Sequence, residues 1–175
     1  DNVRFAFLAS EVLAKCLLSM GYSVQTPCVE NIAYDMVVNG LRAQLKSTRL
    51  KEAMGVLLRR RAGRQKSRQY CLSEFDVLIH EGMVGETNEL ACLHVIPVAE
   101  LFIRRKVGQE DRRAGYLTVY PPWLDPGSKQ REAYDWQTEY RFDPKSLLTN
   151  RQEQERLSEI LKRCRVFRER LTLTA

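Results

Sequence analysis

An aspartate, a glutamine and a lysine lie within one short stretch of the chain, residues 34–46. Asp35 precedes an apolar run, and Gln44 and Lys46 follow it two residues apart. A carboxylate and an amide carbonyl supply the hard oxygen atoms that Mg²⁺ prefers, and an ammonium group neutralises negative charge. If the three side chains face the same way, they would form a small site for a divalent cation and an anionic group.

The surrounding pattern predicts a β-hairpin that would bring these side chains together. Residues 36–38 are apolar and rich in β-branched side chains, and Asn39-Gly40 favours a two-residue type I′ turn. Residues 41–46 form the return strand. Its two faces carry Leu41, Ala43 and Leu45 on one side and Arg42, Gln44 and Lys46 on the other. The right-handed twist of strands would then bring Asp35 close to Gln44 and Lys46.

This spacing resembles the core motif of the PD-(D/E)xK nuclease superfamily. In that motif an Asp opens one strand, and an acidic residue, any residue and a Lys follow on the next. Asp35 matches the first acid and Lys46 the lysine, while Gln44 replaces the second acid, as in some branches. The layout is most similar to intron-encoded homing endonucleases and archaeal-type Holliday-junction resolvases. The resemblance covers roughly residues 5–104.

The resemblance implies a fold, a cofactor and a set of roles. The expected fold is α/β (α+β), a restriction-endonuclease-like core with a mixed central sheet flanked by helices and a C-terminal helix. The expected activity is Mg²⁺-dependent hydrolysis of DNA phosphodiester bonds, with Mn²⁺ able to substitute. Asp35 would be the indispensable ligand, with neutral oxygens from Gln44 and the peptide carbonyl of Leu45. Glu11 would restore the missing negative charge, and Lys46 would neutralise the phosphorus or orient the attacking water.

Glu11 lies on a predicted amphipathic helix, residues 4–20, off its apolar stripe. Ala-Ser-Glu at 9–11 resembles the first-helix acid of the superfamily. The alternative is a solvated acid paired with Lys15, one helical turn away, worth a few tenths of a kcal/mol.

Basic residues predict a DNA-binding surface. Six cations without an acidic neighbour occupy residues 59–68, which we expect to form a flexible arm on phosphates: Arg59, Arg60, Arg61, Arg64, Lys66 and Arg68. The further candidates are Arg49, Arg104, Arg105 and Lys106. The net charge of +6 favours a polyanionic partner. Because each chain has one site and a duplex has two strands, the expected assembly on double-stranded DNA is a homodimer or homotetramer.

The rest of the chain predicts one domain, with a core over roughly residues 4–104, a basic and aromatic extension over 105–145 and a helix over 151–171. Strands are expected at residues 22–26, 54–58, 75–80, 91–96 and 117–120, with an acidic surface loop at 81–90 and a short helix from 98 to 104. Trp136 and Phe142 are expected to pack rather than stack on DNA, and His80 and His94 to be core residues rather than ligands.

Five scattered cysteines, mostly within apolar patterns, predict buried free thiols in a reducing compartment. The chain has no apolar run long enough to cross a bilayer. We therefore expect an intracellular, cytoplasmic, nucleoid-associated protein.

Three functions remain open on the sequence. A metal-dependent endonuclease with homing-type double-strand cleavage is favoured, with Holliday-junction resolution as a variant of it. A catalytically inactive DNA-binding protein on the same scaffold is the second, because Gln44 is neutral. A structural component of a nucleic-acid complex, in which only the basic arm matters, is the third.

Overall fold

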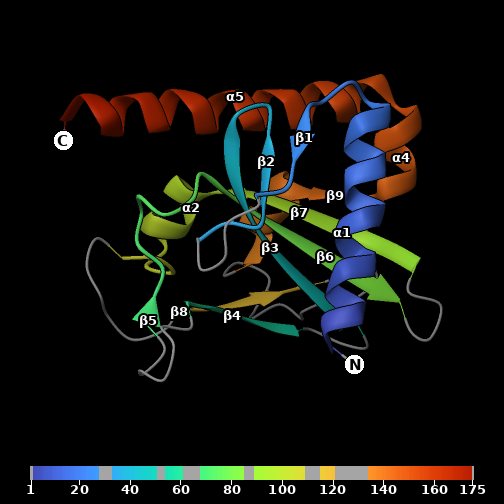
Figure 1. Ribbon diagram of the computed structural model, residues 1–175, viewed down its shortest axis with the longest axis horizontal. Coiled ribbons are helices and arrows are strands. Elements are labelled where there is room, and N and C mark those ends of the chain that lie inside the picture. The colour runs from blue at the N-terminus through green and yellow to red at the C-terminus, as the bar shows by residue number, and fades with distance from the viewer. Residues whose placement is uncertain are drawn as a thin grey trace.

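The computed structural model describes residues 2–27, 33–50, 54–60, 68–84, 89–108, 115–120 and 134–174 (Figure 1). The helices are α1 (Asn2–Ser19), α2 (Val98–Ile103), the 3-10 helix η1 (Asp135–Tyr140), α4 (Pro144–Thr149) and α5 (Arg151–Thr174). The strands are β1 (Val24–Gln25), β2 (Met36–Val38), β3 (Leu41–Leu50), β4 (Met54–Arg60), β5 (Arg68–Gln69), β6 (Val77–Val84), β7 (Glu89–Pro97), β8 (Gly115–Val119) and β9 (Arg141–Phe142).

The main sheet has six strands in the order β1-β2-β3-β6-β7-β9. β3 and β6 run parallel, and every other neighbouring pair is antiparallel. The sheet is therefore mixed, with α1 and α5 packed against it (Figure 1). This confirms the predicted α+β class with a mixed central sheet, flanking helices and a C-terminal helix.

The predicted β2–β3 hairpin is present, and its turn follows from its sequence. Asn39 and Gly40 both have positive φ, 47° and 81°, as a type I′ turn requires. The turn is also held from outside by α5. The Arg165 and Arg168 guanidinium groups donate to the carbonyl oxygens of Asn39 and Gly40, at 3.0 and 2.6 Å. The hairpin is thus fixed at the end opposite Asp35.

β4, β5 and β8 form a second, three-stranded sheet. Its register corrects the expected arm at residues 59–68. Arg59 pairs with Gln69 and Arg60 with Arg68, so both ends of the segment belong to antiparallel strands. The first two residues of the basic run belong to β4 and its last residue belongs to β5. Strand pairing satisfies the backbone polar groups of these residues. Residues 61–67, with three of the predicted contacts, lie outside the described residues.

The prediction of a surface loop over residues 81–90 is wrong at both ends of the loop. β6 continues to Val84 and β7 begins at Glu89, so the hairpin is longer than its acidic sequence indicates. The extra residues of β6 pair with the long strand β3 on one side and with β7 on the other. These pairings bury Glu81 completely.

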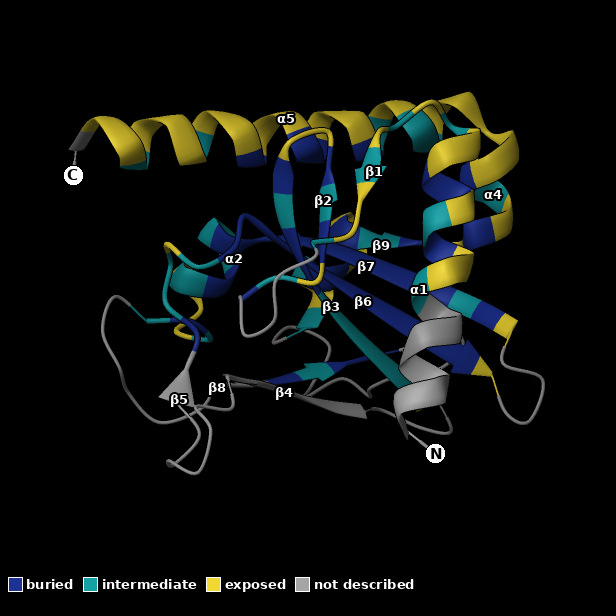
Figure 2. Cartoon of the chain, in the orientation of Figure 1, coloured by how far each residue is buried: buried dark blue, intermediate teal, exposed yellow. Residues whose placement is uncertain are grey.

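The core lies between the main sheet and its helices, and Figure 2 shows β6 and β7 buried along most of their length. α1 contributes Leu13, Cys16 and Leu17 to it. The buried stripe of α5 is Leu157, Ile160, Leu161 and Cys164. Phe142 is buried and Trp136 partly buried, as predicted.

Of the cysteines that the structure describes, all are free thiols and Cys16, Cys92 and Cys164 are buried. Across the described residues, no helix combines the length and apolarity that spanning a bilayer requires.

Candidate active site

Asp35 comes directly before β2, and its carboxylate contacts the Gln44 carboxamide on β3. The paired register of the hairpin ends at Met36 and Ala43, one residue short of Asp35. The Asp35 N–H donates to the Ala43 carbonyl oxygen at 2.9 Å, which holds the residue against β3. The hairpin together with this hydrogen bond therefore brings the carboxylate and the carboxamide together.

Three polar groups converge at the edge of β3 just beyond the end of β2. The Leu45 N–H donates to Asp35 Oδ2 at 2.9 Å. The Gln44 side-chain N–H group donates to the same Oδ2 and also to the Leu45 carbonyl oxygen, at 3.0 Å from the latter. The Asp35 carboxylate and the Leu45 carbonyl therefore face a common point, and a hydrogen-bond donor with partial positive charge lies between them.

Lys46 is on the same face of β3 as Gln44, since residues two apart on a strand point the same way. Its Nζ lies 5.6 Å from the centroid of the Tyr70 ring. The ammonium charge is near enough to Asp35 to lower the pKa of that carboxyl. The structure therefore brings Asp35, Gln44, Leu45 and Lys46 together, while their catalytic roles stay predictions.

Asp35 is exposed as a residue, yet its Oδ2 turns inward onto β3. Loss of hydration raises the pKa of the carboxyl above its ordinary value, and the Leu45 N–H and the Lys46 charge partly offset this rise. A carboxylate that has lost hydration gains from a further positive charge. The site is thus arranged to favour a cation beside Asp35.

The donor set fits Mg²⁺ by its chemistry. It offers one carboxylate, one peptide carbonyl and one carboxamide, all hard oxygen ligands once the Gln44 amide turns its oxygen inward. Mg²⁺ binds through one or two carboxylates and keeps several waters, so an open strand edge suits it. The set contains a single carboxylate.

Glu11, the predicted second carboxylate, lies on α1 with an exposed side chain. Among the side chains that the structure describes, no three His, Cys, Asp or Glu residues are grouped to hold a metal ion. The structure therefore does not gather Glu11 with Asp35 and another acid, and a ligand role for Glu11 stays a prediction.

A different acid lies near Asp35, and sequence reasoning missed it. Glu81 on β6 is 0% exposed, and its Oε2 accepts a hydrogen bond from Ser47 Oγ. Burial raises the pKa of Glu81 to about 7, with the Ser47 hydrogen bond acting against the rise and the Asp35 charge adding to it. The sequence predicts a loop at Glu81, because acids and glycines follow it. No alternation of polar and apolar residues marks the longer strand, because Glu81 and Gly82 interrupt the apolar run before Met83 and Val84.

The two histidines are core residues, as predicted. His80 and His94 are 0% exposed, and their Nδ1 atoms lie 3.3 Å apart. Thr48 Oγ1 lies 2.7 Å from His80 Nε2. Burial lowers the pKa of His80 to about 3 and that of His94 well below its usual value, so both rings are neutral. His80 pairs with Lys46 in register, so the two rings lie next to Lys46 in the sheet.

The described basic candidates differ in their surroundings. Arg49 is exposed near the end of β3. Arg104 stacks on the Trp136 ring, with its guanidinium carbon 4.1 Å from the ring centroid. Arg105 is exposed in the turn after α2, where its φ is 57°, and Lys106 is partly buried. The side chains of Arg59, Arg60 and Arg68 are not described, so their contacts with DNA stay predictions.

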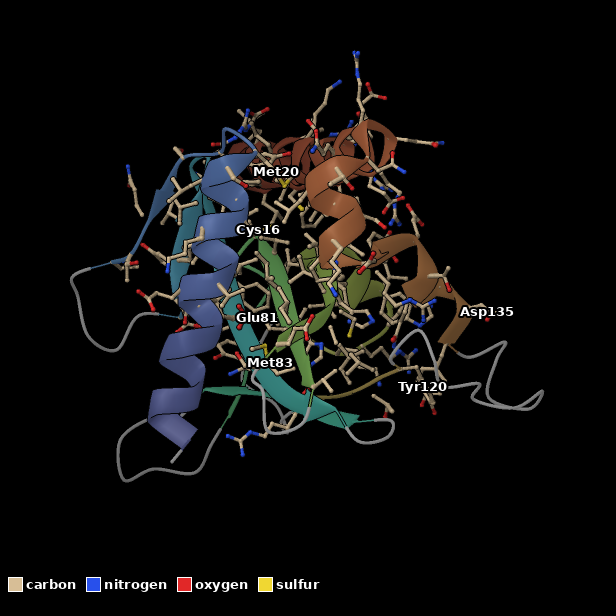
Figure 3. The ribbon with its side chains drawn as sticks, turned by 90° about the vertical axis from the view of Figure 1, so that its right-hand side faces the viewer. Cys16, Met20, Glu81, Met83, Tyr120 and Asp135 are labelled. Carbon is tan, nitrogen blue, oxygen red and sulfur yellow. The ribbon has the colours of Figure 1, made fainter. Side chains whose placement is uncertain are left out.

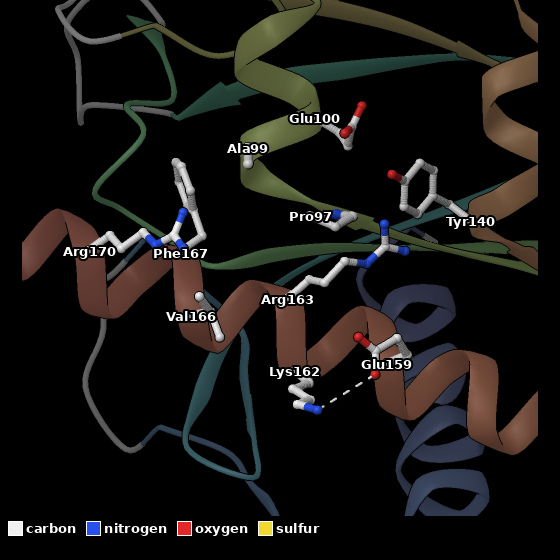
Figure 4. A pocket seen from close by; sticks show the side chains of 10 residues that line it. All are labelled: Pro97, Ala99, Glu100, Tyr140, Glu159, Lys162, Arg163, Val166, Phe167 and Arg170. Carbon is white, nitrogen blue, oxygen red and sulfur yellow. Dashed lines mark ion pairs between the residues drawn. The ribbon is translucent and has the colours of Figure 1, made fainter.

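A groove of about 330 Å³ lies between α2 and α5 (Figure 4). Pro97, Val166 and Phe167 form its apolar wall, and Lys162 lies 3.9 Å from Glu159 at its rim. None of the predicted catalytic residues lines it.

Comparison with known proteins identifies no family. No family model matches the chain, and no curated protein matches it. One similar solved structure is MepB, with a TM-score of 0.52 and 18% identity over 81% of this chain and 97% of the other. Another is the bacterial homing endonuclease I-Ssp6803I, with a TM-score of 0.47 and 22% identity over 75% of this chain and 87% of the other. At these identities the likeness to MepB is one of fold alone.

Proposed function

We propose that this protein is a metal-dependent DNA endonuclease of the PD-(D/E)xK type, most similar in motif to the homing branch. The observation that carries the proposal is the convergence of the Asp35 carboxylate and the Leu45 carbonyl on one point, with the Gln44 amide between them. The proposal rests on these side chains and their motif rather than on distant structural likeness.

Each residue has a role that its position supports. Asp35 and the Leu45 carbonyl would hold the cation, and the Gln44 amide would offer its oxygen as a neutral ligand. When bound, Mg²⁺, or Mn²⁺ in its place, polarises a phosphate oxygen and lowers the pKa of a coordinated water. Lys46 points to the same face and offsets charge on the phosphoryl oxygens or orients the attacking water. Double-stranded DNA would lie along the edge of β3, held by the basic residues.

Cleavage of both strands requires two such sites, so the proposed assembly is a homodimer or homotetramer with the symmetry of its target. A Holliday junction is the alternative substrate, because it too presents two symmetric strands. The neutral Gln44 favours a second candidate function, DNA binding without cleavage, because a site with one carboxylate attracts Mg²⁺ less strongly than a site with two.

Incubation of the purified protein with plasmid, linear duplex or a four-way junction, with Mg²⁺ and without it, tests the proposal. We expect Mg²⁺-dependent cleavage that Asp35→Ala and the isosteric Asp35→Asn abolish. Asp135→Ala is the matched control, since Asp135 is exposed on η1 and Figure 3 shows it far from α1 and Glu81. Binding of DNA without cleavage by the wild type would support the inactive scaffold, and no salt-dependent binding would overturn both.

A further inference from the structure

The buried acid Glu81 has a contact pattern that folding alone does not explain. Its side chain is 0% exposed, and Oε1 has no hydrogen-bond partner among the residues that the structure describes. Its other oxygen, Oε2, accepts from Ser47 Oγ at 2.5 Å. An ionisable group buried with one oxygen unsatisfied costs stability, and a glutamine or an apolar residue would fill this place at lower cost.

The position of Glu81 relates it to the candidate site. β3 and β6 are parallel, and Ser47 pairs with Glu81 just as Lys46 pairs with His80. Ser47 lies two positions after Leu45 on β3, a spacing of about 7 Å, and the Leu45 N–H and carbonyl face Asp35 and Gln44. The negative charge of Asp35 adds to the rise in the pKa of Glu81, as the smallest of its causes.

The face on which Glu81 lies limits its role. Neighbouring residues on a strand alternate, so Glu81 and Ser47 are on the opposite face of the sheet from Lys46 and His80. Figure 3 shows Glu81 on the side of the molecule where α1 runs, with Tyr120 and Asp135 towards the other side. Glu81 therefore acts on the edge of β3 from behind, by its charge and through Ser47, and is not itself a ligand in the present arrangement.

We propose that Glu81 is a positioning residue that supplies the second negative charge of the cation site, in place of the acid that Gln44 lacks. The inference rests on the proposed function, since it assigns a role at the same site. A cation beside Asp35 would favour the ionised form of Glu81, and the ionised carboxylate would in return strengthen cation binding. The Ser47 hydrogen bond keeps the carboxylate over β3. This role explains why an ionisable residue, rather than a neutral one, occupies the buried position.

The test is Mn²⁺ binding, measured by calorimetry or by the electron paramagnetic resonance of free Mn²⁺, with urea unfolding of the metal-free protein in parallel. Glu81→Gln keeps the shape and can still accept from Ser47 but removes the charge. We expect its Mn²⁺ affinity to fall roughly tenfold, while its resistance to urea at about pH 8 rises. A purely structural role would change only the urea result. Glu81→Asp, which keeps the charge, should recover part of the affinity.

Two further variants separate the possible failures. Glu89→Gln makes the same chemical change on the same β6–β7 hairpin, at an exposed position, and should leave Mn²⁺ affinity unchanged. Asp35→Asn should abolish binding. If Asp35→Asn loses Mn²⁺ but Glu81→Gln binds it like the wild type, the role of Glu81 is overturned and the proposed function stands. If Asp35→Asn binds Mn²⁺ like the wild type, the proposed site is overturned and the role of Glu81 with it.

Discussion

The metal-free protein should lose stability as the pH rises through the range in which Glu81 ionises. Burial raises the pKa of Glu81 from 4.5 to about 7. Below pH 4.5 the folded and unfolded chains both hold this proton. Between that pH and about 7 the unfolded chain has released it while the folded chain keeps it, so the contribution of Glu81 to the unfolding free energy falls as pH rises.

The size of this loss follows from the same values. A tenfold change in an ionisation equilibrium corresponds to about 1.4 kcal/mol, so the rise from 4.5 to about 7 means that ionising Glu81 costs the folded state about 3 kcal/mol. This is a large part of the total stability of a small domain, typically about 5–15 kcal/mol. Glu81→Gln removes the titration and should remove the loss.

Urea unfolding of wild type and Glu81→Gln, followed by circular dichroism at several pH values from about 4 to 8, measures the effect. We expect the variant to gain on the wild type with rising pH, by about 3 kcal/mol in all, and the difference to level off above about pH 7. Titrating groups that do not interact with Glu81 change both proteins alike and cancel in the difference. Glu89→Gln, which removes an exposed acid 3.1 Å from Lys145, should run parallel to the wild type.

The reasoning would be refuted if the difference between Glu81→Gln and wild type stayed constant with pH to within about 0.5 kcal/mol, the size of an ordinary surface effect. Such a result would mean that Glu81 is hydrated or already satisfied in the folded protein.

Three other predictions follow from the described contacts. Asp76, 3% exposed, accepts two hydrogen bonds from the Arg42 guanidinium and one from its N–H, so Asp76→Ala should lower the unfolding free energy by about 3 kcal/mol in urea titrations. Gly40→Ala should lower it by about 1 kcal/mol, because φ is +81° in open space, and Gly21→Ala offers a comparison at +84°. Gln44→Glu should bind Mg²⁺ roughly tenfold more tightly in calorimetry but be less stable without the ion, since it sets a second carboxylate against Asp35.

Local patterns in the sequence determined the hairpin and the site that it carries. The Asn39-Gly40 turn fixes the register, and the register fixes which side chains share a face, so Asp35, Gln44 and Lys46 could be brought together from neighbouring residues alone. The helices at residues 2–19 and 151–174 were recognisable for the same reason, because their apolar stripes repeat within a few residues.

Only the tertiary structure decided what lies behind the hairpin. Ser47 and Glu81 are 34 residues apart, and their meeting depends on the parallel pairing of β3 with β6. No local pattern records that pairing, because a parallel partner is reached through a long connection rather than a turn. The sequence therefore predicts a surface loop at Glu81, and only the long-range pairing of two strands places this residue in the interior against Ser47.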